Sequence, residues 1–246
     1  MNTSLLSVQL YTVREALQDD LHGTLARLAD IGFTQVEAYN ILHIPGLGEA
    51  LQAAGLTTPT AHVRFVGLEL EPIFEKARSL GIQTLIDPHI EDSRWQSAAA
   101  VQGVVADLEA AADVAAGFGL KIGYHNHAFE FEASFGGRTA YEHFASQISD
   151  RVGLELDTYW AVVGGADPVG LLGELGPKAV ALHIKDGPGT RDDKDQVALG
   201  RGSMPIRRII EAAPAALRVI ELDDSRGDRF QAVADSVAYL TAEGLA

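Results

Sequence analysis

Short apolar runs alternate along the chain with longer segments in which apolar residues recur at helical spacing. Eight of the short runs predict strands: Leu6–Tyr11, Gln35–Tyr39, Pro59–Val63, Thr84–Pro88, Lys121–Asn126, Gly153–Thr158, Ala179–Lys185 and Arg218–Leu222. The segments between them predict helices, as in Asp107–Phe118 and Arg229–Leu240. Glycine often stands shortly before a strand, as Gly32 does, at the position that is typical of a helix C-cap.

This order of elements predicts a parallel sheet, because parallel strands need a crossover of a dozen or more residues. Eight units in 246 residues average about 31 residues, the size of one strand, one helix and their loops. An open doubly wound sheet is disfavoured, since no glycine-rich phosphate turn follows Leu6–Tyr11. No composition shift divides the chain. We therefore predict one domain over residues 1–246, a single (β/α)8 barrel.

The charge balance excludes several classes of partner. The chain has 34 acidic and 19 basic residues, a net charge of −15, and a dense basic patch is absent, so no nucleic-acid partner is expected. The absence of cysteine excludes disulfides, thiolate nucleophiles and cysteine-based zinc sites. The first residues lack a basic start and a cleavage motif, and no apolar run reaches about 18 residues. We expect a cytoplasmic protein without a membrane partner.

Polar residues gather where the predicted strands end, which is where barrel enzymes have their active sites. Six of the eight histidines lie there: His43, His62, His89, His125, His127 and His183. A more specific set occupies the last four strands: Glu130, Asp157, His183 and Glu221. Their separations of 27, 26 and 38 residues approximate one unit each. Three oxygens and one nitrogen suit a divalent ion such as Mn²⁺, Mg²⁺, Co²⁺ or Zn²⁺. Alternatively, each side chain binds a neighbouring helix N-terminus or arginine.

Six motifs in this order resemble the sugar phosphate isomerases/epimerases of the xylose isomerase-like TIM-barrel superfamily: SVQLYTVRE, GYHNHAFEFE, LELDTYW, ALHIKDG, ALGRGSMP and VIELD. The resemblance spans nearly the whole chain. It implies one divalent metal held by Glu, Asp, His and Glu on strands five to eight, and Asp157, His183 and Glu221 match directly. Many relatives have glutamate where this chain has His125. We favour Glu130 as the fourth ligand, with His125 second; alternatively, Glu130 is solvated on a short hairpin arm.

The resemblance implies that the metal chelates a carbonyl and an adjacent hydroxyl of a ketose or keto-sugar, which lowers the barrier to an enediolate. Glu130 and Glu221 would then be the acid/base pair. Lys185 shares a strand face with His183 and is expected to stabilise the enediolate or protonate a leaving group, unless it only forms a salt bridge to Asp157 or Asp186. His125 is a further candidate base.

We predict an isomerase or epimerase with a small sugar as its substrate, phosphorylated or not. Expected substrate contacts are His62, His127, Glu37 and Trp160. A keto-sugar lyase or dehydratase, similar to inosose dehydratase or a 3-keto-glycoside eliminase, is the main alternative, because it shares the enediolate and suits the histidine-rich YHNH segment. A non-catalytic sugar-binding module is a third. A three-zinc DNA-repair endonuclease is disfavoured, because it needs more metal ligands and a basic surface, whereas this chain has a net charge of −15. Related barrels commonly pair, so a homo-oligomer is one option, but the sequence does not specify the oligomeric state.

Overall fold

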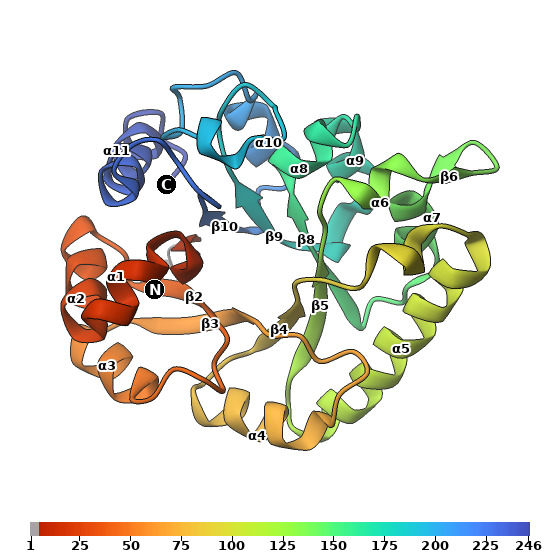
Figure 1. Cartoon of the computed structure of the whole chain (residues 1–246), viewed down its shortest axis with the longest axis horizontal. Coiled ribbons are helices and arrows are strands. Elements are labelled where there is room, and N and C mark those ends of the chain that lie inside the picture. The colour runs from red at the N-terminus through yellow and green to blue at the C-terminus, as the bar shows by residue number, and fades with distance from the viewer. Residues whose placement is uncertain (1–4) are drawn as a thin grey trace.

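Eight parallel strands close into a barrel in the computed structural model, which describes residues 5–246 (Figure 1). In sheet order, the strands are β1 (Leu6–Val8), β10 (Leu217–Ile220), β9 (Ala179–Ile184), β8 (Val152–Asp157), β5 (Lys121–His125), β4 (Thr84–Asp87), β3 (Thr57–His62) and β2 (Gln35–Tyr39). The last gap, between β1 and β2, is closed by one parallel bridge from Gln9 to Glu37. The predicted (β/α)8 barrel is confirmed, and every predicted strand is present with its bounds shifted by at most three residues.

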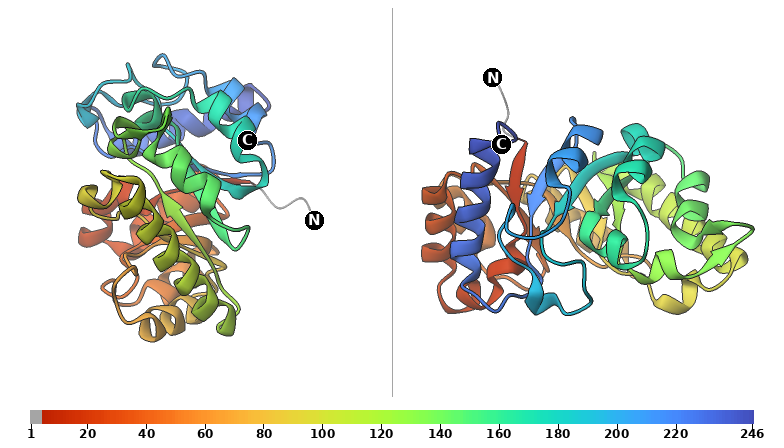
Figure 2. Two further views of the ribbon diagram at one scale, coloured as in Figure 1. Left: turned by 90° about the vertical axis from the view of Figure 1, so that its right-hand side faces the viewer. Right: turned by 90° about the horizontal axis from the view of Figure 1, so that it is seen from above.

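Helices surround the strands on the outside (Figure 2). They are α1 (Arg14–Asp19), α2 (Leu21–Ile31), α3 (Leu47–Ala54), α4 (Leu70–Ser79), α5 (Ala98–Gly117), α6 (Phe129–Glu132), α7 (Ala140–Gln147), α8 (Thr158–Val163), α9 (Pro168–Leu175), α10 (Ile206–Ala212) and α11 (Arg229–Ala242). Short 3₁₀ turns occupy Leu10–Val13, Asp92–Trp95, Gly176–Lys178 and Asp193–Asp195. Within residues 5–246, no helix has both the length and the apolar character needed to cross a bilayer.

Local signals set the helix ends. Gly32 ends α2 with φ 116°, a left-handed conformation, and its N–H donates to the carbonyls of Ala29 and Leu28. Ser97 begins α5, because its side chain accepts the backbone N–H of Ala100. The predicted helix Asp107–Phe118 is therefore the second half of a longer element.

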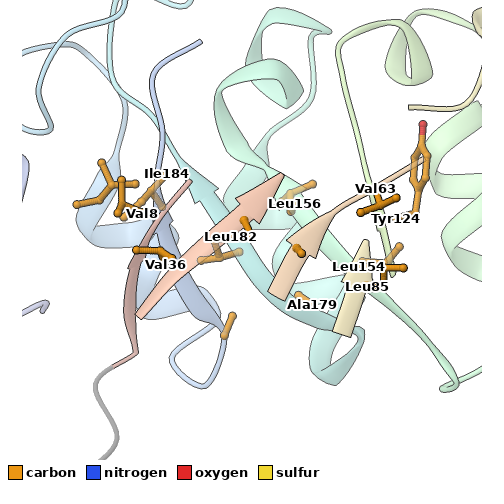
Figure 3. Close-up of a cluster of buried hydrophobic side chains, with 14 of the residues drawn as sticks. Val8, Val36, Val63, Leu85, Tyr124, Leu154, Leu156, Ala179, Leu182 and Ile184 are labelled. Carbon is orange, nitrogen blue, oxygen red and sulfur yellow. The ribbon is translucent and has the colours of Figure 1, made fainter. Parts of the chain in front are cut away.

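Strand alternation divides the barrel into an apolar outer layer and a polar inner layer. On β8, Leu154 and Leu156 belong to the buried hydrophobic cluster shown in Figure 3, whereas Glu155 and Asp157 point to the opposite face. Pairing then aligns the inner residues of neighbouring strands, since Asp157 lies opposite His183. The polar inner layer at the carboxyl ends of the strands thus gathers side chains from separate parts of the chain.

The segment after β5 differs from the expectation for Phe129–Glu132. Instead of a hairpin arm it forms α6, one helical turn, and the hairpin follows as β6 (Ser134–Phe135) and β7 (Arg138–Thr139). Glu130 is buried, and Glu132 is exposed and pairs with Arg191. The alternation of phenylalanine and glutamate is satisfied equally by one helical turn, which buries Phe131 together with Glu130.

Candidate active site

A cavity of about 790 Å³ opens at the carboxyl ends of the strands. Its lining includes predicted site residues that lie at the ends of four strands or in the segments directly after them: His62, His125, His127, Trp160 and Glu221. Lys185, Asp157 and His183 are buried and are not among the lining residues. The cavity lies where barrel enzymes bind their substrates.

Three predicted ligands converge beside this cavity. Asp157, His183 and Glu221 each offer a ligand atom, and the three atoms lie within 4.8 Å of one another. Asp157 Oδ1 caps α8 by accepting the N–H of Trp160 at 2.9 Å, which fixes its carboxylate. His183 Nδ1 lies 2.6 Å from Glu221 Oε2, and its Nε2 lies 2.6 Å from Glu37 Oε1. Two buried carboxylates and one held imidazole are a donor set that fits a divalent cation.

Lys185 lies within the same group, on the strand face that its spacing from His183 predicted. Its Nζ is 2.7 Å from Asp157 Oδ2, 2.8 Å from Glu221 Oε2 and 2.7 Å from Asp223 Oδ2. Burial lowers the pKa of Lys185, but these three carboxylates outweigh it and hold the pKa well above its ordinary value. The sequence suggested Asp157 or Asp186 as a salt-bridge partner of Lys185, and Lys185 contacts Asp157. Asp186 instead accepts backbone N–H groups of the following loop, from Gly187, Gly200, Gly202 and Met204.

Glu155, which was not among the predicted site residues, holds three histidines together. Its Oε2 lies 2.5 Å from His62 Nε2, 3.0 Å from His125 Nδ1 and 3.1 Å from His183 Nε2. The pairing of β5 with β8 sets His125 opposite Glu155. Strand alternation was a usable signal, because Glu155 stands two residues before Asp157 and shares its face.

The surroundings shift the pKa values of two of these imidazoles in opposite directions. Burial lowers the pKa of His183, but Glu155, Glu221 and Glu37 outweigh it and hold the pKa well above its ordinary value. Burial lowers the pKa of His125 well below its ordinary value, so this ring is neutral at pH 7. A neutral imidazole beside a cavity is chemically able to accept a proton.

The structure does not bring Glu130 to Asp157, His183 and Glu221. Its carboxylate accepts the Tyr124 hydroxyl at 2.6 Å and the His127 backbone N–H at 2.8 Å. The Tyr124 ring stacks on Trp95 with centroids 5.1 Å apart, within the buried aromatic cluster outside the barrel lumen. The α6 turn thus directs Glu130 towards the outward-facing side of β5.

The end of β5 presents His125 to the inner layer. His125 Nε2 lies 3.7 Å from Asp157 Oδ2, which makes His125 the strand-five side chain beside the candidate ligands. The second choice for a fourth ligand is therefore better positioned than Glu130.

The expected substrate contacts separate into two depths. His62, His127 and Trp160 line the cavity, and Trp160 Nε1 donates to Asp223 Oδ2 at 3.0 Å. Glu37 is fully buried and bonds to Gln9 and His183. Its contacts are those of a residue that orients His183.

Residues 7–241 match the family model described as xylose isomerase-like TIM barrel. The chain belongs to the xylose isomerase-like TIM-barrel family. A comparison with curated proteins finds no match.

Several solved structures are similar to this chain over nearly its whole length. A sugar phosphate isomerase/epimerase from Parabacteroides distasonis has 25% identity and a TM-score of 0.80, covering 98% of this chain and 94% of its own. The IOLI protein with a binding zinc atom has 17% identity and a TM-score of 0.72, covering 98% and 97%. A probable 3-DHS dehydratase, AsbF from Bacillus anthracis, has 14% identity and a TM-score of 0.69, covering 96% and 98%. The latter two show the shared fold.

Proposed function

We propose that this chain is a divalent-metal-dependent sugar isomerase or epimerase that acts on a ketose or keto-sugar through an enediolate. The observation that carries the proposal is the convergence of Asp157, His183 and Glu221 beside a large cavity, with Lys185 among them. Similarity to the isomerase/epimerase from Parabacteroides distasonis supports the reaction class.

Asp157, His183 and Glu221 would hold the ion, and His125 is the candidate for a fourth position. A bound divalent ion supplies stabilisation of negative charge on substrate oxygens. The mixed set of carboxylate and imidazole donors suits Mn²⁺, Mg²⁺, Co²⁺ or Zn²⁺. The zinc atom of the IOLI structure is consistent with such an ion in this fold.

The chain's own residues supply the proton chemistry. His125, if not a ligand, is a neutral base whose Nδ1 is held by Glu155, so its other nitrogen is available to take a proton from carbon. Lys185 carries a full positive charge at neutral pH and stabilises the negative charge that develops on the enediolate. Glu221 borders the cavity and is the candidate acid/base group for the other face. Burial raises its pKa, but Lys185 and His183 outweigh burial and hold the pKa well below its ordinary value, so the proton that Glu221 returns to carbon must first be taken up from solvent.

A keto-sugar lyase or dehydratase is the second candidate, and the position of Glu130 favours it. An epimerase needs two acid/base groups on opposite faces of the reacting carbon. The strand-five carboxylate that would be one of them is bonded to Tyr124 and the His127 backbone. A base on one face and Lys185 as acid suffice for β-elimination, which begins with the same proton abstraction.

Proton exchange with solvent tests both candidates. Mn²⁺-loaded protein is incubated with a panel of ketoses and keto-sugars in D₂O, and products are followed by NMR. An isomerase or epimerase yields a deuterated isomer, whereas a lyase yields an unsaturated keto-sugar. The chelator-treated protein and His183→Ala are the controls and should give neither. Sugar binding without deuterium incorporation would identify a binding module and refute the proposal.

A further inference from the structure

The cavity extends well beyond the candidate catalytic residues. Asp157, His183 and Glu221 stand at the ends of β8, β9 and β10, whereas much of the lining comes from the loops after β1, β2 and β3. We call the part formed by Tyr11, Tyr39, Leu42 and Leu68 the outer subsite. On the basis of the proposed function, we infer that the substrate is a keto-sugar carrying a second, uncharged ring, and that the outer subsite binds this ring.

Exposed apolar side chains are concentrated at the outer subsite. Among residues 5–246, four large hydrophobic side chains are exposed, and three of them line the cavity: Tyr11 at 40%, Leu42 at 44% and Leu68 at 58%. The fourth, Val114, lies on α5 and does not line the cavity. Exposed apolar groups gathered around one concavity are typical of a surface that a ligand covers.

Tyr11 is held as a rigid platform within this group. Its ring meets Tyr39 edge to face, with centroids 5.4 Å apart, and the Arg14 guanidinium lies 4.2 Å from the Tyr11 ring centroid. An aromatic ring that is fixed yet still exposed binds another ring at low entropic cost. The outer subsite therefore suits a flat or ring-shaped group.

The backbone at the end of β2 is strained where it enters the outer subsite. Asn40 has φ 49°, and it is the one non-glycine residue with positive φ in the described part of the chain. Its N–H donates to the His62 carbonyl at 3.0 Å, so the strained turn links the subsite to the strand that carries His62. Such strain persists where surrounding structure enforces it, and it is concentrated at ligand sites.

The charges around the cavity argue against a phosphate on this ring. Arg14 Nη1 already donates to the carbonyls of Tyr11 and Asp223, at 3.0 and 2.8 Å. Arg64 also lines the cavity, but its Nη1 lies 3.5 Å from Oε1 of Glu91, so this guanidinium already has a carboxylate partner. Asp193, Glu221 and Asp223 add carboxylates to the lining.

The cavity's size agrees with a two-ring ligand. Cavities of about 300–1,000 Å³ enclose ligands of drug size. At about 790 Å³, this cavity lies in the upper part of that range.

Binding of unreactive glycosides tests the inference without requiring turnover. Methyl and phenyl β-glycosides of glucose, galactose and xylose are titrated into the protein by calorimetry. The phenyl member of at least one pair should bind about tenfold more tightly than its methyl partner. Tyr11→Ala and Leu68→Ser should reduce this preference to less than about threefold. Val114→Ser, which alters an equally exposed apolar residue away from the cavity, should leave it unchanged.

Equal binding of methyl and phenyl glycosides in all three pairs, or no measurable binding of any phenyl glycoside, would overturn the inference. So would a phenyl preference that persists in Tyr11→Ala and Leu68→Ser, or tighter binding of glucose 6-phosphate than of phenyl glucoside. An equal loss of the phenyl preference in Val114→Ser would also overturn the inference. The deuterium experiment separates this result from the proposed function. If deuterium is incorporated but phenyl glycosides bind no more tightly than methyl glycosides, only the outer subsite is refuted. If phenyl glycosides bind more tightly but no deuterium is incorporated, only the proposed reaction is refuted.

Discussion

Replacing Lys185 with methionine should reveal how strongly the buried carboxylates require a cation. Lys185 Nζ lies within 2.8 Å of Asp157, Glu221 and Asp223, and the lysine is almost fully buried. Methionine keeps most of the side-chain volume but removes the positive charge. Removing one partner of a buried ion pair costs about 3–5 kcal/mol in free energy of unfolding.

This cost corresponds to a lower melting temperature. For a chain of this length each kcal/mol shifts Tm by roughly 2–4 °C, so we expect Lys185→Met to melt about 6–20 °C below wild type in chelator. Added Mn²⁺ restores positive charge among the carboxylates, and it should raise the Tm of the variant by more than that of wild type. Turnover should fall by about 10²-fold even at saturating metal, because the enediolate loses its cationic partner.

Differential scanning fluorimetry with and without Mn²⁺ measures these shifts, and Lys178→Met is the matched control. Lys178 Nζ donates to the backbone carbonyls of Ala145 and Ile148, so its removal leaves no buried carboxylate without a cation. Its Tm should fall by much less, and Mn²⁺ should stabilise it as it does wild type. A Lys185→Met Tm within about 3 °C of wild type in chelator, which corresponds to roughly 1 kcal/mol instead of the expected 3–5 kcal/mol, would refute the reasoning.

The remaining predictions concern metal, proton transfer and pH. His183→Ala should lose most of about one ion per chain by elemental analysis, since it removes the nitrogen ligand, and full occupancy in the double variant with Asp157→Ala would exclude this site. His125→Ala should reduce turnover more than Glu130→Gln does, because His125 borders the cavity and Glu130 bonds to Tyr124; the reverse ranking in kcat assays would return Glu130 to the catalytic group. At saturating Mn²⁺, which keeps protons from displacing the ion at His183, the rate should fall on the acid side only well below pH 6.5, because burial lowers the pKa of His125 and only its neutral ring accepts a proton. A kcat/KM profile whose acid limb lies at or above 6.5 would rule out His125 as the base.

Regular alternation made the barrel predictable from the sequence. A parallel strand buried on both faces leaves few choices of register, so the apolar runs locate all eight strands. The first strand was predicted too long because Gln9 caps a 3₁₀ turn, with its side chain accepting the N–H of Tyr11. The segment Phe129–Glu132 was harder, since four residues with period two also fit one helical turn.

The same reasoning explains which site residues were predictable. His183 and Lys185 stand near a strand end, where alternation fixes the face of each side chain. Glu130 follows a strand by several residues, and nothing in the sequence specifies that its carboxylate turns back to Tyr124. Glu155 follows the same strand alternation as Asp157. It was not predicted as a site residue because it is a single charged residue within the apolar run Leu154–Leu156.

The inner layer carries more negative than positive charge, and this imbalance connects the site's protonation to cation binding. Four carboxylates, those of Glu37, Glu155, Asp157 and Glu221, are buried there beside two groups whose pKa is held well above its ordinary value, Lys185 and His183. Burial raises the pKa of Glu37 and of Asp157, so both hold protons more tightly than an exposed carboxyl does. Buried charges of one sign are stable only when protons or a cation compensate them. Protons and a divalent cation are therefore alternative occupants of the same negative potential, which is the electrostatic condition that a metal-dependent active site requires.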